Sequence, residues 1–251
     1  MKRRLSETHT MQLHAFKDAD AVSLAAAEWI TDLIQQKLRN QSRFTWLLSG
    51  GNTPKHLYQL LAAQQFSSKI DWKKIHIFFG DERVVPFEDE RNNGKMAHET
   101  LLSKVPIPQE QVHFIRTDVD PTIAAEEYEI LLRQHFDEAR TSFDLALLGM
   151  GDDGHTLSIF PGSSLVDEKK RWVVALFLPS QQMHRITLTP LVVNRSATIA
   201  FLVTGLSKSR ALEQVIKGDY QPEVYPAQLI KPANGELHWF VDESAFSASG
   251  S

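Results

Sequence analysis

Residues 44–54 read FTWLLSGGNTP, and this stretch decides the fold class. Its first half, 44–48, is a nearly continuous apolar run with aromatic and β-branched residues, as is typical of a strand covered on both faces. Two glycines and polar residues follow, and Pro54 suits the first position of a helix. A buried strand that passes through a short turn into a helix is the repeating unit of parallel α/β sheets.

The same alternation extends outward along the chain. Apolar residues recur at spacings of three and four in several stretches, which predicts amphipathic helices at about residues 18–40, 54–65, 122–139 and 208–217. Apolar runs of strand length lie at 75–79, 112–115, 143–148, 172–178, 197–203 and 237–241, with a possible first strand at 11–16. We therefore predict an α/β fold, a Rossmann-like, doubly wound and mostly parallel sheet with helices on both faces.

Length and composition fit one globular domain. The chain has 251 residues, of which 42% are hydrophobic and 23% charged, and a chain of this size buries about three quarters of the surface that it exposes when unfolded. The sequence has no repeat and no low-complexity tract, and its Pro- and Gly-bearing stretches are loop-sized. We expect one catalytic α/β domain at residues 11–246, between a flexible N-terminus at 1–10 and a flexible C-terminus at 247–251.

Charge and cysteine content exclude several functions. The chain has 0 Cys, which excludes disulfides, thiolate catalysis and cysteine-ligated metals and indicates a reducing, cytoplasmic setting. The formal net charge is −4 and the basic residues are dispersed, so we expect no nucleic-acid partner. No stretch approaches the ~20 consecutive apolar residues of a membrane helix, and the polar start does not resemble a signal peptide, so we expect no membrane partner.

Four junctions at strand ends are candidates for chemistry, because ligands of doubly wound sheets bind beyond the carboxyl ends of the strands. The first is the glycine turn of the opening stretch, whose backbone N–H groups and hydroxyls suit an anion such as phosphate. An ordinary tight turn is the alternative, since the turn matches neither a P-loop nor a dinucleotide fingerprint. Its candidate ligand-binding residues are Ser49, Gly50, Gly51, Asn52 and Thr53.

The second junction is Gly80-Asp81-Glu82-Arg83, after the run 75–79. A carboxylate such as Asp81 can orient sugar hydroxyls, while Arg83 can hold an anionic group or a developing oxyanion. A solvated charge cluster in a loop is the alternative interpretation. The polar residues 91–93 suit the lining of the same loop.

The third junction, residues 149–156, reads GMGDDGHT and follows the run 143–148. Its three glycines let the backbone bend sharply, which can bring Asp153 and His155 to a common ligand. A histidine is the natural general base near neutral pH. We therefore expect His155 to be catalytic, although most histidines in a chain have no such role.

The fourth junction, 204–208, ends in Lys208, which offers a point charge to a phosphate; Arg185 is a second candidate cation. A surface lysine without a ligand is the alternative. Together, the four junctions present glycines, cations and an acid with a histidine. This combination indicates a small, polar, phosphorylated ligand.

These four segments, in this order, resemble the 6-phosphogluconolactonase family, which shares its fold with the glucosamine-6-phosphate isomerase/deaminase family. The most specific matches are 48–54, 80–83 and 149–156, followed by Phe160-Pro161-Gly162. The resemblance implies hydrolysis of 6-phospho-D-glucono-1,5-lactone to 6-phosphogluconate, the second step of the oxidative pentose phosphate pathway, without a cofactor or metal. It says nothing of oligomeric state.

The resemblance also assigns roles to residues. It makes His155 the base that activates water, with Asp153 orienting it, and it places Arg83 at the lactone or its oxyanion. The phosphate is expected at the turn 49–53 with Lys208 and Arg185. Lactonases often carry an aromatic residue after the asparagine of the loop that follows Asp-Glu-Arg, whereas this chain departs from the family by reading Asn92-Asn93-Gly94.

Two alternative functions remain at the level of sequence. An aminosugar deaminase is similar at Asp-Gly-His but continues toward Asn-Glu-Pro, and this chain has Ile159-Phe160-Pro161 there. A phenylalanine cannot supply the proton transfer of that glutamate. A non-catalytic sugar-phosphate sensor is the second alternative, but the residues before the first strand are too few for a helix-turn-helix.

Overall fold

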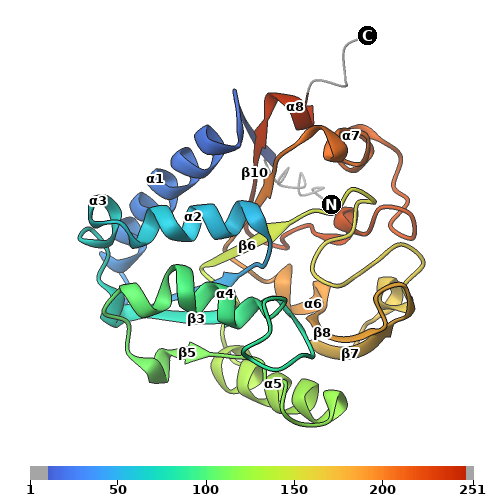
Figure 1. Ribbon diagram of the computed structural model, residues 1–251, viewed down its shortest axis with the longest axis horizontal. Coiled ribbons are helices and arrows are strands. Elements are labelled where there is room, and N and C mark those ends of the chain that lie inside the picture. Colours follow the sequence, from blue (N-terminus) through green and yellow to red (C-terminus); the bar gives the residue numbers. More distant parts are fainter. Residues whose placement is uncertain (1–10, 247–251) are drawn as a thin grey trace, which may run out of the picture.

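The main sheet of the computed structural model has seven strands in the order β1-β10-β9-β6-β2-β3-β5, and every adjacent pair is parallel (Figure 1). The structure describes residues 11–246, so the expected flexible ends at 1–10 and 247–251 lie outside the described residues. The doubly wound parallel sheet predicted from the sequence is confirmed. Its strands are β1 Met11–Phe16, β2 Phe44–Leu48, β3 Ile75–Phe79, β5 Val112–His113, β6 Leu145–Gly149, β9 Thr198–Val203 and β10 Glu236–Asp242.

Helices cover both faces of this sheet, as its fully buried strands β2 and β9 require. On one face, α2 Asn52–Ala62 packs Tyr58 edge-on against Trp46 of β2. On the other, α5 Pro121–Phe136 packs Phe136 against Phe78 of β3. Trp46 and Phe78 belong to opposite faces, because Phe78 pairs with the residue after Trp46 and side chains alternate along a strand. The other helices are α1 Ala19–Leu38, α3 Gln64–Ser67, α4 Asn93–Thr100, α6 Pro190–Val193, α7 Ser209–Lys217 and α8 Glu243–Phe246.

A second, antiparallel sheet of three strands was not expected. It has the order β4-β8-β7, with β4 Asp81–Arg83, β8 Met183–Leu188 and β7 Val173–Leu178. The run 172–178 is therefore a strand, but it forms a hairpin with β8 outside the main sheet. Gly80 joins the two sheets, because its N–H donates to Leu48 and its carbonyl accepts from Leu188.

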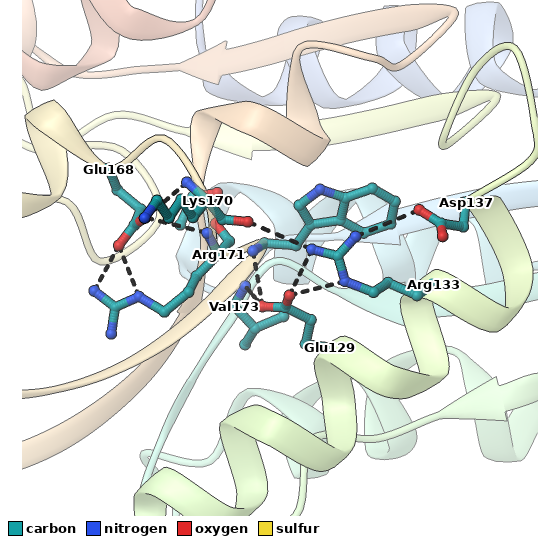
Figure 2. A network of polar contacts seen from close by, with 9 residues as sticks. Glu129, Arg133, Asp137, Glu168, Lys170, Arg171 and Val173 are labelled. Atoms are coloured by element: carbon teal, nitrogen blue, oxygen red, sulfur yellow. Dashed lines mark hydrogen bonds and ion pairs between the residues drawn. The ribbon is translucent and has the colours of Figure 1, made fainter.

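Side chains of α5 hold this small sheet in place (Figure 2). The Glu129 carboxylate accepts hydrogen bonds from the backbone N–H groups of Trp172 and Val173, at 2.8 and 3.1 Å. Arg133 pairs with Glu129 at 2.7 Å and lies over the Trp172 ring, 4.4 Å from its centroid. The partly exposed ion pair contributes little by itself, so the two backbone hydrogen bonds are the main anchor.

The structure also corrects the expected limits of several elements. Helix α2 begins at Asn52, so Pro54 is its third residue and not its first. Helix α4 was not predicted; it begins at Asn93, the last residue of the expected polar loop 91–93, and the Asn92 side chain caps it by accepting from the Lys95 N–H at 2.8 Å. The strand expected at 112–115 stops at His113. Among the described residues, no helix has the length and apolar character needed to cross a membrane.

Candidate active site

A cavity of about 200 Å³ lies where the carboxyl ends of β2, β3 and β6 meet. All four junctions singled out from the sequence contribute to it, the fourth through Lys208 alone. A larger cavity of about 350 Å³ lies beside α7, but its lining contains no carboxylate or histidine, so chemistry points to the smaller one. The smaller cavity is lined by Ser49, Gly50, Gly51, Asp81, Arg83, Asn93, Gly149, Met150, Gly151, His155, Leu157 and Lys208.

The loop after β6 presents His155 to this cavity. Its backbone is closed by a hydrogen bond from the Gly151 N–H to the His155 carbonyl, at 2.8 Å. The Asp153 carboxylate lies 2.6 Å from His155 Nδ1 and also accepts from the His155 backbone N–H at 3.0 Å. Because Nδ1 donates to this carboxylate in the neutral ring, Nε2 keeps the free lone pair that a general base needs.

Two glycines allow the loop to take this shape. A Cβ on Gly151 would lie 2.0 Å from His155 Nδ1, so only glycine leaves room for the ring. Gly154 has φ +80° and packs against Tyr225, a conformation that residues with a side chain rarely adopt. On its other face, the His155 ring contacts the Phe160 ring, with centroids 4.3 Å apart. The histidine is therefore fixed by a carboxylate and by an aromatic ring.

Asp81 lies on the opposite wall and is fully oriented by its neighbours. Its carboxylate accepts from Ser158 Oγ at 2.6 Å and from Asn93 Nδ2 at 3.3 Å. Asn93 in turn lies so close to Gly50 that a Cβ there would be 2.0 Å from Asn93 Oδ1. The glycine turn after β2 and the start of α4 are therefore in direct contact, and together they form one side of the cavity.

Two cations reach the cavity. Arg83 donates from Nη1 to the Arg91 carbonyl at 2.7 Å, and its buried Nε has no hydrogen-bond partner among the described residues. Lys208 forms a close ion pair with Asp152, which lowers the pKa of that carboxyl below its usual range. Both side chains are thus available to an anionic ligand, Lys208 by exchanging one anion for another.

Four of the residues singled out from the sequence do not line the cavity. Asp153 lies behind His155, and Asn52 starts α2. Thr53 is engaged with Thr204, at 2.8 Å between their hydroxyl oxygens. Arg185 pairs with Arg83 across β8 and β4 and so faces the same side of the small sheet, but it is only 5% exposed and donates to Gln181.

Sequence reasoning missed other lining residues. Gly149, Met150 and Gly151 belong to the third junction but were not assigned a role, and Asn93 was noted only as part of a polar loop. Leu157 has a left-handed φ of 56°, for which the sequence offers no signal. Over residues 11–246, no group of three or more His, Cys, Asp or Glu side chains is arranged to hold a metal ion.

Comparisons with known proteins identify the family of this chain. The family model of glucosamine-6-phosphate isomerases/6-phosphogluconolactonase matches residues 17–239. A 6-phosphogluconolactonase of Nostoc sp. is 37% identical over 91% of this chain and 94% of its own. One of Synechocystis sp. is 39% identical, covering 86% and 89%. A probable chloroplastic 6-phosphogluconolactonase of Oryza sativa is 35% identical, covering 92% and 75%.

Solved structures give the same result. The crystal structure of 6-phosphogluconolactonase from Thermotoga maritima superposes with a TM-score of 0.81 at 30% identity, covering 93% of this chain and all of the other. A monomeric glucosamine-6-phosphate deaminase has a TM-score of 0.80 at 19% identity, covering 94% and 98%, so the fold alone does not separate the two activities. This chain belongs to the family of glucosamine-6-phosphate isomerases and 6-phosphogluconolactonases.

Proposed function

We propose that this chain is a 6-phosphogluconolactonase, which hydrolyses 6-phospho-D-glucono-1,5-lactone to 6-phosphogluconate in the oxidative pentose phosphate pathway of the cytoplasm. The observation that carries the proposal is the His155–Asp153 pair, 2.6 Å apart, at a cavity that also holds Arg83 and Lys208. A base beside two cations suits hydrolysis of an anionic ester. The names of the relatives support the same substrate.

The hydrolysis needs one base and one oxyanion partner. His155 Nε2 takes a proton from water as the water oxygen bonds to the lactone carbonyl carbon, and Arg83 stabilises the negative charge on the former carbonyl oxygen. When this intermediate collapses, the bond to the ring oxygen breaks, and the imidazolium returns its proton to that oxygen. Asp153 keeps the ring in the productive tautomer and stabilises the imidazolium. A lactone is an activated ester, so neither a covalent nucleophile nor a metal is required.

The phosphate end of the substrate fits the other side of the cavity. Ser49, Gly50 and Gly51 precede the N-terminus of α2, where free backbone N–H groups favour an anion, and Lys208 adds a full charge. Thr53 and Asn52 extend this turn. Arg185 lies 4.0 Å from the Asp81 carboxylate, so we assign it to the support of Asp81, which orients the sugar hydroxyls.

The deaminase alternative fits the cavity less well. Phe160 occupies the stretch in which deaminases carry a glutamate that assists ring opening, and its ring packs on His155. An apolar side chain at this place excludes water from one face of the base but transfers no proton. The sensor alternative leaves the oriented His155–Asp153 pair without a purpose.

The experiment follows the decay of freshly prepared 6-phosphogluconolactone with and without the protein, and in parallel ammonia release from glucosamine 6-phosphate. We expect faster lactone decay and no ammonia. The His155→Ala variant should lose at least about 10²-fold in turnover and keep its affinity for 6-phosphogluconate, because the base acts in the transition state. Ammonia release would favour the deaminase, and inactivity toward both substrates would favour the sensor.

A further inference from the structure

Glu82 is a buried carboxylate beside the cavity that the reaction itself does not use. The residue is 2% exposed. Its carboxylate accepts three backbone hydrogen bonds, from the N–H groups of Arg83 at 2.7 Å, Asn93 at 2.8 Å and Gly94 at 2.8 Å. Three donors on one carboxylate are unusual for a side chain in the middle of a short strand, and all three belong to the cavity wall or to its neighbours.

These hydrogen bonds join the two ends of one connection. The connection 84–92 leaves β4 after Arg83 and returns to the start of α4 at Asn93. Glu82 binds the backbone at both ends, and the Arg83 guanidinium adds a further link to the Arg91 carbonyl at 2.7 Å. The positions of Arg83 and Asn93, which both line the cavity, therefore depend on the same carboxylate.

We propose that Glu82 is a positioning residue, whose buried carboxylate closes the connection 84–92 and so holds Arg83 and Asn93 against the catalytic cavity. The inference rests on the proposed lactonase function. Glu82 also supplies what the sequence of α4 lacks, because an Asn-Gly start is a poor helix former and the Glu82 oxygens accept from the first two N–H groups of the helix. The cavity wall is thus built by one carboxylate acting on two elements.

The charge of Glu82 depends on pH near neutrality. Burial raises its pKa to about 7, although the three N–H donors oppose this rise, and the neighbouring Asp81 adds to it. The other groups whose charges act on it are Arg185 on β8 and Tyr128 on α5, and neither forms an ion pair with it among the described residues. Burial thus favours the neutral carboxyl in the closed connection, and deprotonation as the pH rises through 7 loosens the connection.

The main test is Glu82→Gln, with Glu90→Gln as the matched control. Glu90 is an exposed carboxylate on the same connection. The glutamine keeps the size of the side chain but turns one acceptor into a donor that faces a backbone N–H. We expect Glu82→Gln to lower kcat/KM by about 10- to 100-fold, because displacements near 1 Å cost up to about 10²-fold, and Glu90→Gln to stay within about twofold of wild type.

A double-mutant cycle separates positioning from a general loss of structure. If Glu82 acts through Arg83, then Glu82→Gln should cost at least about threefold less in an Arg83→Ala background than in the wild type. Amide hydrogen exchange at Asn93 and Gly94 should also become faster in Glu82→Gln and stay unchanged in Glu90→Gln. This second readout needs no activity, so it stays informative if the proposed function fails.

A pH series isolates the charge. In a His155→Ala background, where the catalytic histidine no longer titrates, the affinity for 6-phosphogluconate should weaken between pH 6 and 8 more than it does when Glu82→Gln is added. Should Glu82→Gln not fold, Glu82→Asp keeps the charge but is too short to reach both ends, and we expect it also to lower kcat/KM. Wild-type activity in either folded variant, or an equal loss in both Arg83 backgrounds, overturns the proposal.

Discussion

Gly151→Ala is the sharpest test of the catalytic loop. A Cβ at this position would lie 2.0 Å from His155 Nδ1, 2.2 Å from Cε1 of the same ring and 2.7 Å from Asp153 Oδ1. Contacts of a real Cβ are essentially never shorter than 3.0 Å, so the ring must move by at least about 1 Å. The backbone itself tolerates alanine, because Gly151 is not among the residues with a positive φ.

A displacement of this size at the general base predicts a loss of about 10²-fold in kcat. The new methyl group stands where Nδ1 now meets Asp153, so the hydrogen bond that fixes the tautomer is lost as well. We expect the melting temperature to change by only a few degrees, about the effect of 1 kcal/mol in a domain of this size, because the loop lies at the cavity and not in the core.

The assay measures lactone decay at saturating substrate, corrected for spontaneous hydrolysis. Gly149→Ala, at the last residue of β6 directly before the loop, is the matched control, because a Cβ there meets only Ser49 Oγ at an ordinary 3.7 Å. We expect its kcat to stay within about threefold of wild type. The comparison uses kcat and not KM, because Gly149 borders the cavity and a methyl group there can alter substrate binding. A Gly151→Ala enzyme with wild-type kcat would refute the placement of His155 as the base.

Three further predictions concern charge. Lys208→Ala should raise KM for the lactone at least about tenfold with little change in kcat. Lys217→Ala, at the exposed end of the helix that follows, is the control and should change neither constant. An unchanged KM in Lys208→Ala would place the phosphate elsewhere. Burial raises the pKa of Glu82 from 4.5 to about 7, so the contribution of this group to stability is complete below pH 4.5 and lost as the pH rises through 7. In urea titrations over this range, the free energy of unfolding of Glu82→Gln should therefore gain about 3 kcal/mol relative to that of the wild type. A difference between the two proteins that does not change with pH would contradict this prediction. Burial, with His135 beside it, lowers the pKa of His113 to about 4, so the contribution of His113 to stability is complete above pH 6.5 and lost as the pH falls through 4. Because the side chain is partly exposed, His113→Phe should remove about 2 kcal/mol or less of this loss of stability in acid. An unaltered midpoint of acid unfolding would count against this prediction.

The His155 loop shows how far local sequence can be interpreted. Asp153 and His155 are two residues apart, so a short glycine-rich turn is enough to bring them together, and their pairing was foreseen. The turn 49–51 was also foreseen, because its glycines directly follow the apolar run of β2, and the turn lines the cavity. The assignment of Arg185 to the phosphate had no such local basis and stays a prediction; the side chain is 5% exposed and lies 4.0 Å from the Asp81 carboxylate.

Helix α4 and strand β8 show where sequence reasoning stops. Residues 93–100 begin with Asn-Gly, which is a poor helix start, and the helix begins there because Asn92 and the distant Glu82 carboxylate satisfy the first N–H groups. Strand β8 carries polar residues because it pairs with β4 and β7 in a small sheet and not with the apolar strands of the main one. Neither partner is visible from the local pattern.

The sequence by itself determined the parallel sheet, the helices on its two faces and the edge at which the candidate cavity lies. These follow from apolar periodicity and from turn residues, which act over a few positions along the chain. Only the tertiary structure decided which cations reach the cavity, and that Glu82 holds its wall. Such contacts join residues far apart in the chain, and their geometry depends on how the two sheets pack around Gly80.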